Sequence, residues 1–253
     1  MADTSEILKH ILKFPPNSQK PITYSFLIPN KHGLDTAFNL LEAHNNSLNS
    51  IGGNPSLEIS IFISATETFS RKNLNCSVEA SLAAFQPVIT SARSANLGVR
   101  AYISVVLGCP FEGHVSPSTV ASLATKLLAM GATEIDLGDT TGMGTAPSTM
   151  ELLRSLSAAG VRNENITMHF HDTYGMALVN TAVSLEHGVR KFDGSVAGLG
   201  GCPYSPGATG NVGTEDLVFF CQTLGMETGI DLQTLAQVGE WIGKVVGKTD
   251  RSK

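Results

Sequence analysis

The sequence has little charge, few aromatic residues and no long hydrophobic run. Charged residues make up 15% and aromatic residues 6% of its 253 residues, and the net charge is −5. No apolar stretch approaches the ~20 residues that a helix needs to cross a bilayer. No cluster of lysine and arginine marks a nucleic-acid surface. These absences predict a soluble protein with no membrane and no nucleic-acid partner.

The spacing of the cysteines also excludes two classes of protein. Cys76, Cys109, Cys202 and Cys221 lie far apart and form neither a CxxC zinc pattern nor the dense framework of a secreted domain. A reducing intracellular compartment is therefore expected. The first residues are acidic and contain neither an Arg-rich presequence nor a signal-peptide core, so we expect any targeting segment to be missing from this chain.

Short strand-like runs alternate with longer helix-like runs along the chain. Hydrophobic residues make up 42%, which suits one α/β domain. The helix-like runs have readable ends, with Pro117 opening one and Gly131 closing it, and with Gly188 closing another. Strand–helix alternation with short connections predicts a parallel sheet covered by helices. The expected strands are Ile22–Ile28, Leu57–Ser64, Val99–Val106, Glu134–Gly138, Ile166–His171 and Lys191–Val196.

Parallel strands leave two architectures, an open doubly wound sheet and a closed eight-stranded barrel. No GxGxxG follows the first strand, which weakens the dinucleotide-binding version of the former. Polar and glycine-rich residues instead follow strand after strand, as at Gly108, Gly138-Asp139 and His171-Asp172. Sites in TIM-type barrels are assembled in this way, at the carboxyl ends of several strands. The sequence therefore predicts a TIM-type (β/α) barrel, although six strands do not close one.

We expect a single domain over residues 1–247. The polar run His44–Pro55 is predicted to be an insertion that projects into solvent, because it has too few apolar side chains to bury itself. The charged residues 248–253 are predicted to form a disordered tail.

The sharpest local pattern is His169-Phe170-His171 at the end of an expected strand. Successive side chains of a strand face opposite ways, so the two imidazoles share one face. Side by side at a strand end, they can chelate one divalent cation. The alternative is a pair of polar residues at a barrel mouth without a metal.

A glycine-rich loop follows the next strand and runs from Gly198 to Asn211. The backbone at Gly200 and Gly201 can come close to a ligand. Cys202 can exchange a proton or act as a nucleophile if its pKa falls, the alternative being an inert thiol in a tight loop. Asn211 supplies a neutral oxygen that suits Mg²⁺ or Mn²⁺.

Two further residues have both a functional and a structural interpretation. Asp139 falls just past its strand, where it can accept a proton or hold a substrate hydroxyl, or else cap the following helix. Arg100 lies inside a strand and needs a partner there, either an acid or a substrate carbonyl or phosphate.

Five segments together resemble the 3-hydroxy-3-methylglutaryl-CoA lyase family. The resemblance runs from about Met1 to Gly243, and its most specific part is the Gly-Gly-Cys-Pro-Tyr loop followed by Gly-Asn. The segments are Asn73-Leu-Asn-Cys-Ser, Gly108-Cys-Pro-Phe-Glu-Gly, Leu137-Gly-Asp-Thr-Thr-Gly, His169-Phe-His-Asp-Thr-Tyr-Gly and Val196-Ala-Gly-Leu-Gly-Gly-Cys-Pro-Tyr.

The resemblance implies metal-dependent cleavage of 3-hydroxy-3-methylglutaryl-CoA to acetoacetate and acetyl-CoA, in leucine breakdown and ketone-body formation. The partner would be a small acyl-CoA, and a homodimer stays open. The family is typically mitochondrial, which implies the matrix, with the cytoplasm as the alternative. By resemblance the metal ligands are His169, His171 and Asn211, the catalytic residues are Cys202, Asp139 and His169, and the substrate contacts are Arg100, Gly200 and Gly201.

One departure from the family pattern affects the expected activity. The first strand of the family carries Arg-Asp-Gly-Leu-Gln-Asn-Glu, whose aspartate is a metal ligand, and the second strand brings a glutamate. Neither motif occurs in this sequence. We therefore expect a barrel that lacks its first two strands and little activity from this chain alone. The alternatives are a synthase or aldolase on the same scaffold and a shortened homologue that does not turn over substrate.

Overall fold

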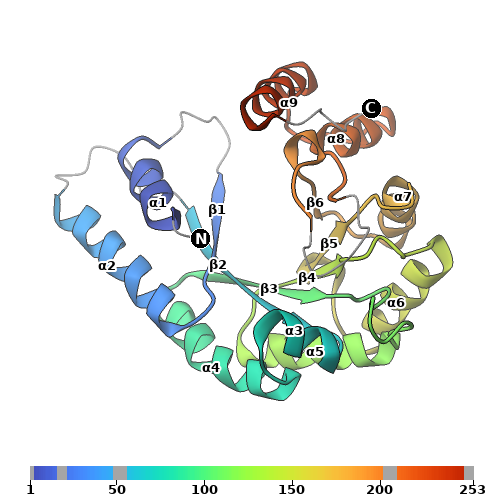
Figure 1. Ribbon diagram of the computed structural model, residues 1–253, viewed down its shortest axis with the longest axis horizontal. Helices are drawn as coiled ribbons and strands as arrows, with labels where there is room; N and C mark the ends of the chain where they lie inside the picture. The colour runs from blue at the N-terminus through green and yellow to red at the C-terminus, as the bar shows by residue number, and fades with distance from the viewer. Residues whose placement is uncertain (1–2, 16–21, 48–55, 202–209, 248–253) are drawn as a thin grey trace.

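The computed structural model describes residues 3–15, 22–47, 56–201 and 210–247 (Figure 1). Within them, one parallel sheet has the order β1-β2-β3-β4-β5-β6. Its strands are β1 Thr23–Leu27, β2 Ser56–Ser64, β3 Gly98–Ser104, β4 Glu134–Asp139, β5 Ile166–Phe170 and β6 Phe192–Asp193. The helices are α1 Thr4–Lys13, α2 Lys31–Ser47, α3 Glu67–Leu74, α4 Val78–Ser94, α5 Pro117–Met130, α6 Ala146–Ala158, α7 Ala177–His187, α8 Thr214–Thr223 and α9 Leu232–Val246, with 3₁₀ turns η1 Asn163–Asn165 and η2 Val196–Gly198.

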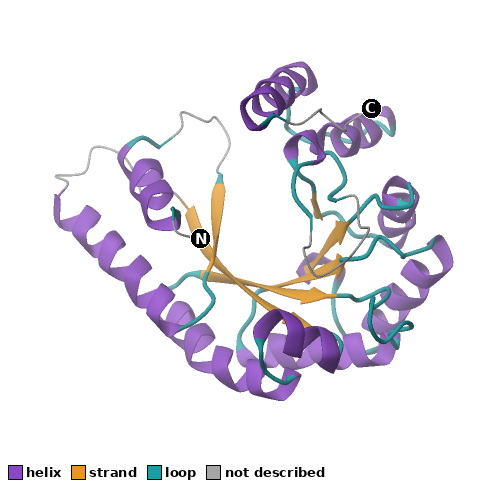
Figure 2. Ribbon diagram, in the orientation of Figure 1, coloured by secondary structure: helices purple, strands orange, loops and turns teal. Residues whose placement is uncertain are grey.

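The strand order decides between the two predicted architectures. Each strand lies beside the one that precedes it in the chain, without the reversal that defines a doubly wound sheet. Right-handed crossovers then place the connecting helices on one side. Figure 2 shows this arrangement, with a curved sheet whose convex side is lined by helices. The predicted (β/α)-barrel fold is confirmed, and among the described residues β1 and β6 each have one neighbour, so the sheet is open.

The two faces of the sheet differ in chemistry. In β3, Val99, Ala101 and Ile103 are fully buried against the helices, while the alternate residues Arg100 and Tyr102 are half-buried on the concave face. In β2, Ile59, Ile61 and Ile63 are likewise buried. The core therefore lies between the sheet and its outer helices, and the concave face is lined with polar side chains in place of the branched apolar layers usual inside such barrels.

Two strand ends differ from the sequence prediction by more than one residue. Strand β3 stops at Ser104 and not at Val106, because Val105 takes a left-handed conformation with φ of 60°. Strand β6 covers only Phe192–Asp193, because the chain turns into η2, where Ala197 has φ of 57°. The buried Glu215 carboxylate accepts a hydrogen bond of 3.0 Å from the N–H of Ala197 and holds this turn.

The first residues of the predicted polar insertion are part of a helix. Helix α2 continues to Ser47, so residues 44–47 are helical and not a solvent loop. The fully buried Leu34 anchors the helix, and the helix continues beyond the apolar part of its sequence. Residues 48–55 and the predicted tail 248–253 lie outside the described residues. The single domain over residues 1–247 stays a prediction.

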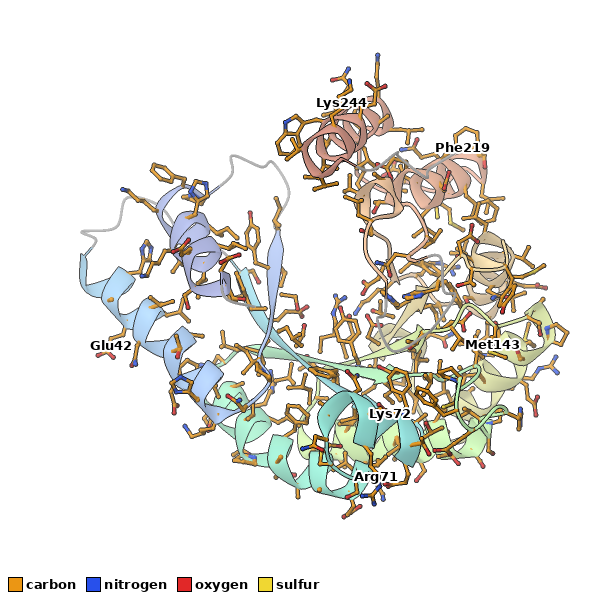
Figure 3. All side chains as sticks on the ribbon, viewed as in Figure 1. Glu42, Arg71, Lys72, Met143, Phe219 and Lys244 are labelled. Carbon is orange, nitrogen blue, oxygen red and sulfur yellow. The ribbon has the colours of Figure 1, made fainter. Side chains whose placement is uncertain are left out.

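The glycine signals for helix ends are confirmed. Gly131 and Gly188 follow α5 and α7 with φ of 112° and 102°, which a residue with a side chain adopts at a cost. Helices α8 and α9 close the described chain, and Figure 3 shows Phe219 and Lys244 pointing outward from them. None of the helices in the described ranges is both long and apolar enough to cross a membrane.

Candidate active site

The two histidines of the sequence motif project from the end of β5 toward the concave side. Their ring centroids lie 5.3 Å apart with an interplanar angle of 56°. Met168 and Phe170, the alternate residues, are buried on the helix side. Strand alternation thus places both imidazoles on one face, close enough for a nitrogen of each to contact one ion at about 2.1 Å.

Asn211 lies beside His171 because the chain returns to the end of β5 after the glycine-rich loop. His171 and Asn211 form an isolated antiparallel bridge, and the N–H of Val212 donates to the carbonyl of Phe170 over 3.1 Å. The Asn211 amide nitrogen donates to the carbonyl oxygen of Leu199 over 2.9 Å. This bond orients the amide and leaves its Oδ1 without a donor.

Three buried atoms of this group have no hydrogen-bond partner. They are the Nδ1 atoms of His169 and His171 and the Oδ1 atom of Asn211. A buried polar atom without a partner costs about 1–3 kcal/mol, so a fold retains such a set when a ligand completes it. We call His169, His171 and Asn211 the histidine–asparagine cluster. Two imidazole nitrogens and an amide oxygen fit a divalent cation.

The protonation state of His171 suits a ligand role. Burial, and then the neighbouring His169, lowers the pKa of His171 to about 4, although the adjacent Asn211 side chain acts in the opposite direction. The imidazole is therefore neutral at pH 7, and a neutral imidazole offers the lone pair that a metal requires.

Two parts of the glycine-rich loop, at Gly200 and Gly210, lie close to each other beside this cluster. A Cβ at Gly210 (φ of 112°) would lie 2.3 Å from the carbonyl oxygen of Gly200, so only glycine fits this position. A Cβ at Gly200 would lie 3.1 Å from the Asn211 amide nitrogen. The predicted contact Gly200 thus lies at the cluster and Gly201 lies beside Gly210, whereas Cys202 lies outside the described residues.

Asp139 is fully buried and is the last residue of β4. Its Oδ2 accepts a hydrogen bond of 3.0 Å from the N–H of Gly144, where a Cβ would lie 2.6 Å from that oxygen. Its Oδ1 has no hydrogen-bond partner. Burial raises the pKa of Asp139 to about 6, although hydrogen bonds from the backbone of residues 142–144 and the nearby His169 act in the opposite direction. The carboxyl group therefore stabilises the loop that follows β4, and its pKa lies near neutral pH.

Deeper in the concave face, Arg100 lies among four carboxylates. Its Nε is 3.1 Å from Glu58 and 2.9 Å from Glu134, and its Nη1 is 3.0 Å from Asp193 and 3.6 Å from Asp136. We call these five residues the Arg100 network. Lys191 also pairs with Glu134. The structure thus shows the acid partners of Arg100, and its role toward substrate stays a prediction.

The carboxylates of this network differ in their affinity for a proton. Burial and the neighbouring Asp193 raise the pKa of Asp136 well above its usual value. Burial acts in the same direction on Asp193, but hydrogen bonding from His169 and Asp136 and the charge of Arg100 hold its pKa below the usual range. Asp193 therefore holds a proton less tightly than Asp136 does.

Asp193 links the network to the histidines. Its Oδ2 accepts a hydrogen bond of 3.0 Å from the Tyr102 hydroxyl and lies 3.6 Å from Nδ1 of His169. One ligand atom each from Asp136, His169 and Asp193 lie within 4.8 Å of one another, a group that could hold a metal ion. Sequence reasoning missed Tyr102, Asp136 and Asp193. The signal was present as polar residues at alternate positions of otherwise apolar strands.

Of the residues singled out from the sequence, the structure brings together His169, His171, Asn211 and Gly200. Arg100 reaches His169 only through Asp193. The strand order and this cluster at the carboxyl ends of the strands define a (β/α)-barrel protein with a candidate metal centre.

Comparison with known proteins makes the class specific. The HMGL-like family model matches residues 1–242, and the chain belongs to this family. It is 45% identical over all 253 residues to the mitochondrial hydroxymethylglutaryl-CoA lyase of Macaca fascicularis, covering 72% of that protein. It is 43% identical to the cytoplasmic 3-hydroxy-3-methylglutaryl-CoA lyase of Danio rerio, covering 100% of the chain and 70% of that protein.

Two solved structures show the same fold. The crystal structure of hydroxymethylglutaryl-CoA lyase from Pseudomonas aeruginosa matches with a TM-score of 0.87 at 40% identity, covering 100% of this chain and 78% of that one. The HMG-CoA lyase from Acinetobacter baumannii in complex with coenzyme A and 3-methylmalate matches with a TM-score of 0.84 at 32% identity, covering 99% and 75%. The family is one of carbon–carbon lyases, and this chain is a homologue of its hydroxymethylglutaryl-CoA lyases.

Proposed function

We propose that this chain forms the metal-binding and thiol-bearing part of a hydroxymethylglutaryl-CoA lyase, which cleaves 3-hydroxy-3-methylglutaryl-CoA to acetoacetate and acetyl-CoA. The observation that supports this most directly is the histidine–asparagine cluster, where two imidazoles and one amide with buried, unpartnered polar atoms lie together at the strand ends. The coenzyme A bound to the A. baumannii relative supports an acyl-CoA substrate.

His169, His171 and Asn211 are the proposed ligands of the cation. Their two nitrogens and one oxygen suit Mg²⁺ or Mn²⁺. When bound, such an ion supplies a Lewis acid that lowers the pKa of the substrate's tertiary hydroxyl and fixes its orientation. The neutral state of His171 at pH 7 keeps that ligand available.

Proton transfer is assigned to two side chains. Removal of the tertiary hydroxyl proton turns the C–O bond into a ketone, the adjacent C–C bond breaks, and its electron pair passes into the thioester enolate. Asp139 is the proposed acceptor, because its Oδ1 has no partner and its pKa of about 6 lies near the working pH. Cys202 is proposed to protonate the enolate carbon, which releases acetyl-CoA.

The substrate is proposed to lie against the glycine-rich loop. Gly200 and Gly201 leave their backbone uncovered beside Asn211, so a thioester or carboxylate can approach closely. Arg100 keeps 21% of its side chain exposed while it faces carboxylates, which leaves a limited surface for a substrate carbonyl. The matrix of the mitochondrion is the proposed compartment, as for the Macaca relative, and the cytoplasm, as for the Danio relative, is the alternative.

The open sheet favours a second candidate, a homologue that binds metal without turnover. The described β1 and β6 each have one neighbour, so the concave site is not enclosed. The sequence also contains no Arg-Asp-Gly motif to supply an anionic ligand. Loss of a charged catalytic group typically costs several orders of magnitude in rate. We expect low activity from the chain alone.

A paired assay tests both candidates. The chain is expressed alone and fused behind two β/α units of a family member that carry Arg-Asp-Gly, and Mg²⁺-dependent release of acetoacetate is followed. We expect activity in the fusion and little in the chain alone. A fusion with the changes His171→Ala and Cys202→Ala should be inactive, whereas the exposed His32→Ala serves as a control. Full activity in the double variant would contradict the site assignment.

A further inference from the structure

We propose that Asp193 is a positioning residue that holds the His169 imidazole by its Nδ1 and so directs Nε2 toward the cation. The inference rests on the proposed metal role of His169. It assigns a function to the Arg100 network, which otherwise only balances its own charges.

The sheet register places the two residues side by side. His169 on β5 pairs with Asp193 on β6, so their side chains leave the same face of neighbouring strands. Nδ1 of His169 lies 3.6 Å from Oδ2 of Asp193 and has no hydrogen-bond partner. Hydrogen bonds of catalytic groups are often long in ligand-free structures and shorten in complexes. A small movement of the two side chains toward each other would therefore complete this hydrogen bond.

The His169 ring has one buried side and one accessible side. Its Nδ1 is buried, whereas 25% of the side chain is exposed. The accessible part of the ring thus lies away from Asp193. Tyr102 stands edge-on to the ring, with centroids 6.4 Å apart and an interplanar angle of 81°. These contacts restrict rotation of the imidazole about its side-chain bonds, which is the preorganisation that a metal ligand requires.

Asp193 is itself fixed from the neighbouring strands. Its Oδ1 accepts a hydrogen bond of 3.0 Å from Nη1 of Arg100, and its Oδ2 accepts one of 3.0 Å from the Tyr102 hydroxyl. Arg100 is held in turn by Glu58 on β2 and Glu134 on β4. Five adjacent strands therefore contribute to the position of one imidazole.

Asp193 is better suited to position the ligand than to be a ligand. Both of its oxygens already accept hydrogen bonds. The Arg100 guanidinium lies 3.0 Å from Asp193 and 3.6 Å from Asp136, so a divalent cation placed between these carboxylates and His169 would meet a positive charge. The close grouping of Asp136, His169 and Asp193 is then explained as support for one metal ligand.

The chemical consequence is a fixed tautomer. A carboxylate that accepts the Nδ1 proton keeps the lone pair on Nε2 and raises its basicity toward a metal. Loss of such a partner typically weakens metal binding by about 10–100-fold. This loss is the measurable effect of the proposed contact.

The test measures Mn²⁺ affinity of the full chain by electron paramagnetic resonance of the free ion. Asp193→Asn should weaken binding by about 10–100-fold, because an amide can still accept from Arg100 while losing the carboxylate at His169. The matched control is Glu58→Gln, which removes a carboxylate from Arg100 without touching His169 and should weaken binding clearly less than Asp193→Asn does. Equal losses in both variants would overturn the proposal, since they would report only the charge of the network.

A second variant separates positioning from direct ligation. Asp136→Asn should leave Mn²⁺ affinity near wild type if Asp136 and Asp193 are not ligands. A loss as large as that of Asp193→Asn would show that both carboxylates bind the ion directly and would overturn the proposal. If Asp193→Asn fails to fold, Tyr102→Phe removes one hydrogen bond to Asp193 and should give a smaller loss in the same direction; an unchanged affinity would count against the proposal.

A metal-free readout distinguishes this inference from the proposed function. In ¹⁵N-histidine spectra of the chain, His169 should carry its proton on Nδ1, and Asp193→Asn should move the population toward the Nε2–H tautomer. An Nε2–H tautomer in the wild type, or no change in the variant, would overturn the proposal. A wild-type chain that shows the Nδ1–H tautomer but binds no Mn²⁺ would refute the metal centre and leave the Asp193 contact standing.

Discussion

The concave face of the sheet carries two polar groups of opposite character. In the Arg100 network, one guanidinium lies within 4.0 Å of four carboxylates, so charges are paired inside the protein. In the histidine–asparagine cluster, three buried polar atoms have no partner. The two groups lie on neighbouring strands and meet at Asp193. The two groups differ in charge pairing: the Arg100 network holds its own counter-charges, whereas the imidazoles and amide of the cluster have unpartnered atoms that a cation can complete.

The two groups are expected to contribute to different properties of the protein. Buried charges are tolerated only with partners, so the network should matter for folding. Unpaired polar atoms lower stability, so the cluster should matter for binding. Four changes test this division, in order of their expected effect on the free energy of unfolding.

The largest effect is expected from Arg100→Met. The change leaves Glu58, Asp136 and Asp193 without their cation, and breaking a buried ion pair by removing one partner typically costs about 3–5 kcal/mol. Urea unfolding measures the loss. Arg162→Met is the control, because its pair with Glu164 is exposed on both sides and such pairs contribute about 0–1 kcal/mol. Equal effects of the two changes would contradict the structural role of the network.

Asp139→Asn should raise the free energy of unfolding by an amount that depends on pH. The pKa of Asp139 is about 6 in the fold against 3.8 for an ordinary aspartate, so between these values the unfolded chain loses its proton first. The free energy of unfolding of the wild type should therefore fall by roughly 3 kcal/mol as the pH rises from 4 to 6, and it should stay low above pH 6.

The measurement for Asp139 is the difference in unfolding free energy between wild type and Asp139→Asn over this pH range. Asparagine retains an oxygen for the N–H of Gly144 and has no charge to bury. A difference that does not change between pH 4 and 6 would show that burial does not perturb this carboxyl group.

Gly210→Ala should cost about 1–3 kcal/mol, because left-handed strain at a residue with a side chain is of this size. The added Cβ would also lie 2.3 Å from the carbonyl oxygen of Gly200. Thermal unfolding measures the loss. Gly160→Ala is the matched control, since it has φ of 82° but nothing within 4 Å of an added Cβ. A cost no larger than that of the control would show that the loop has room to move away from the Asn211 side.

The smallest effect on unfolding is expected from His171→Ala. The cavity it leaves is offset by removal of a buried atom without a partner, so we expect a change below about 1 kcal/mol. Mn²⁺ at 100 times its Kd should stabilise the wild type by about 2.7 kcal/mol and the variant not at all. Calorimetry with and without Mn²⁺ measures both quantities, and a variant that Mn²⁺ still stabilises would exclude His171 as a ligand.

Local patterns predicted the parts of the site that lie within one strand or one turn. The shared face of His169 and His171 follows from the two-residue period of a strand, and Gly131 and Gly188 marked helix ends because few other residues adopt their backbone angles. The start of the polar insertion was wrong, because a helix nucleated by apolar residues near Leu34 extends into the polar sequence that follows.

The sequence by itself determined the alternation of strands and helices, the pair of imidazoles on one face and the family to which the chain is similar. Only the tertiary structure decided that Asp193 would lie beside His169, that Arg100 would face four carboxylates and that Asn211 would return to His171. Periodicity is a property of a few consecutive residues, whereas these contacts join residues between 24 and 93 positions apart. Their positions are set by strand order and register, which depend on the packing of the whole sheet against its helices.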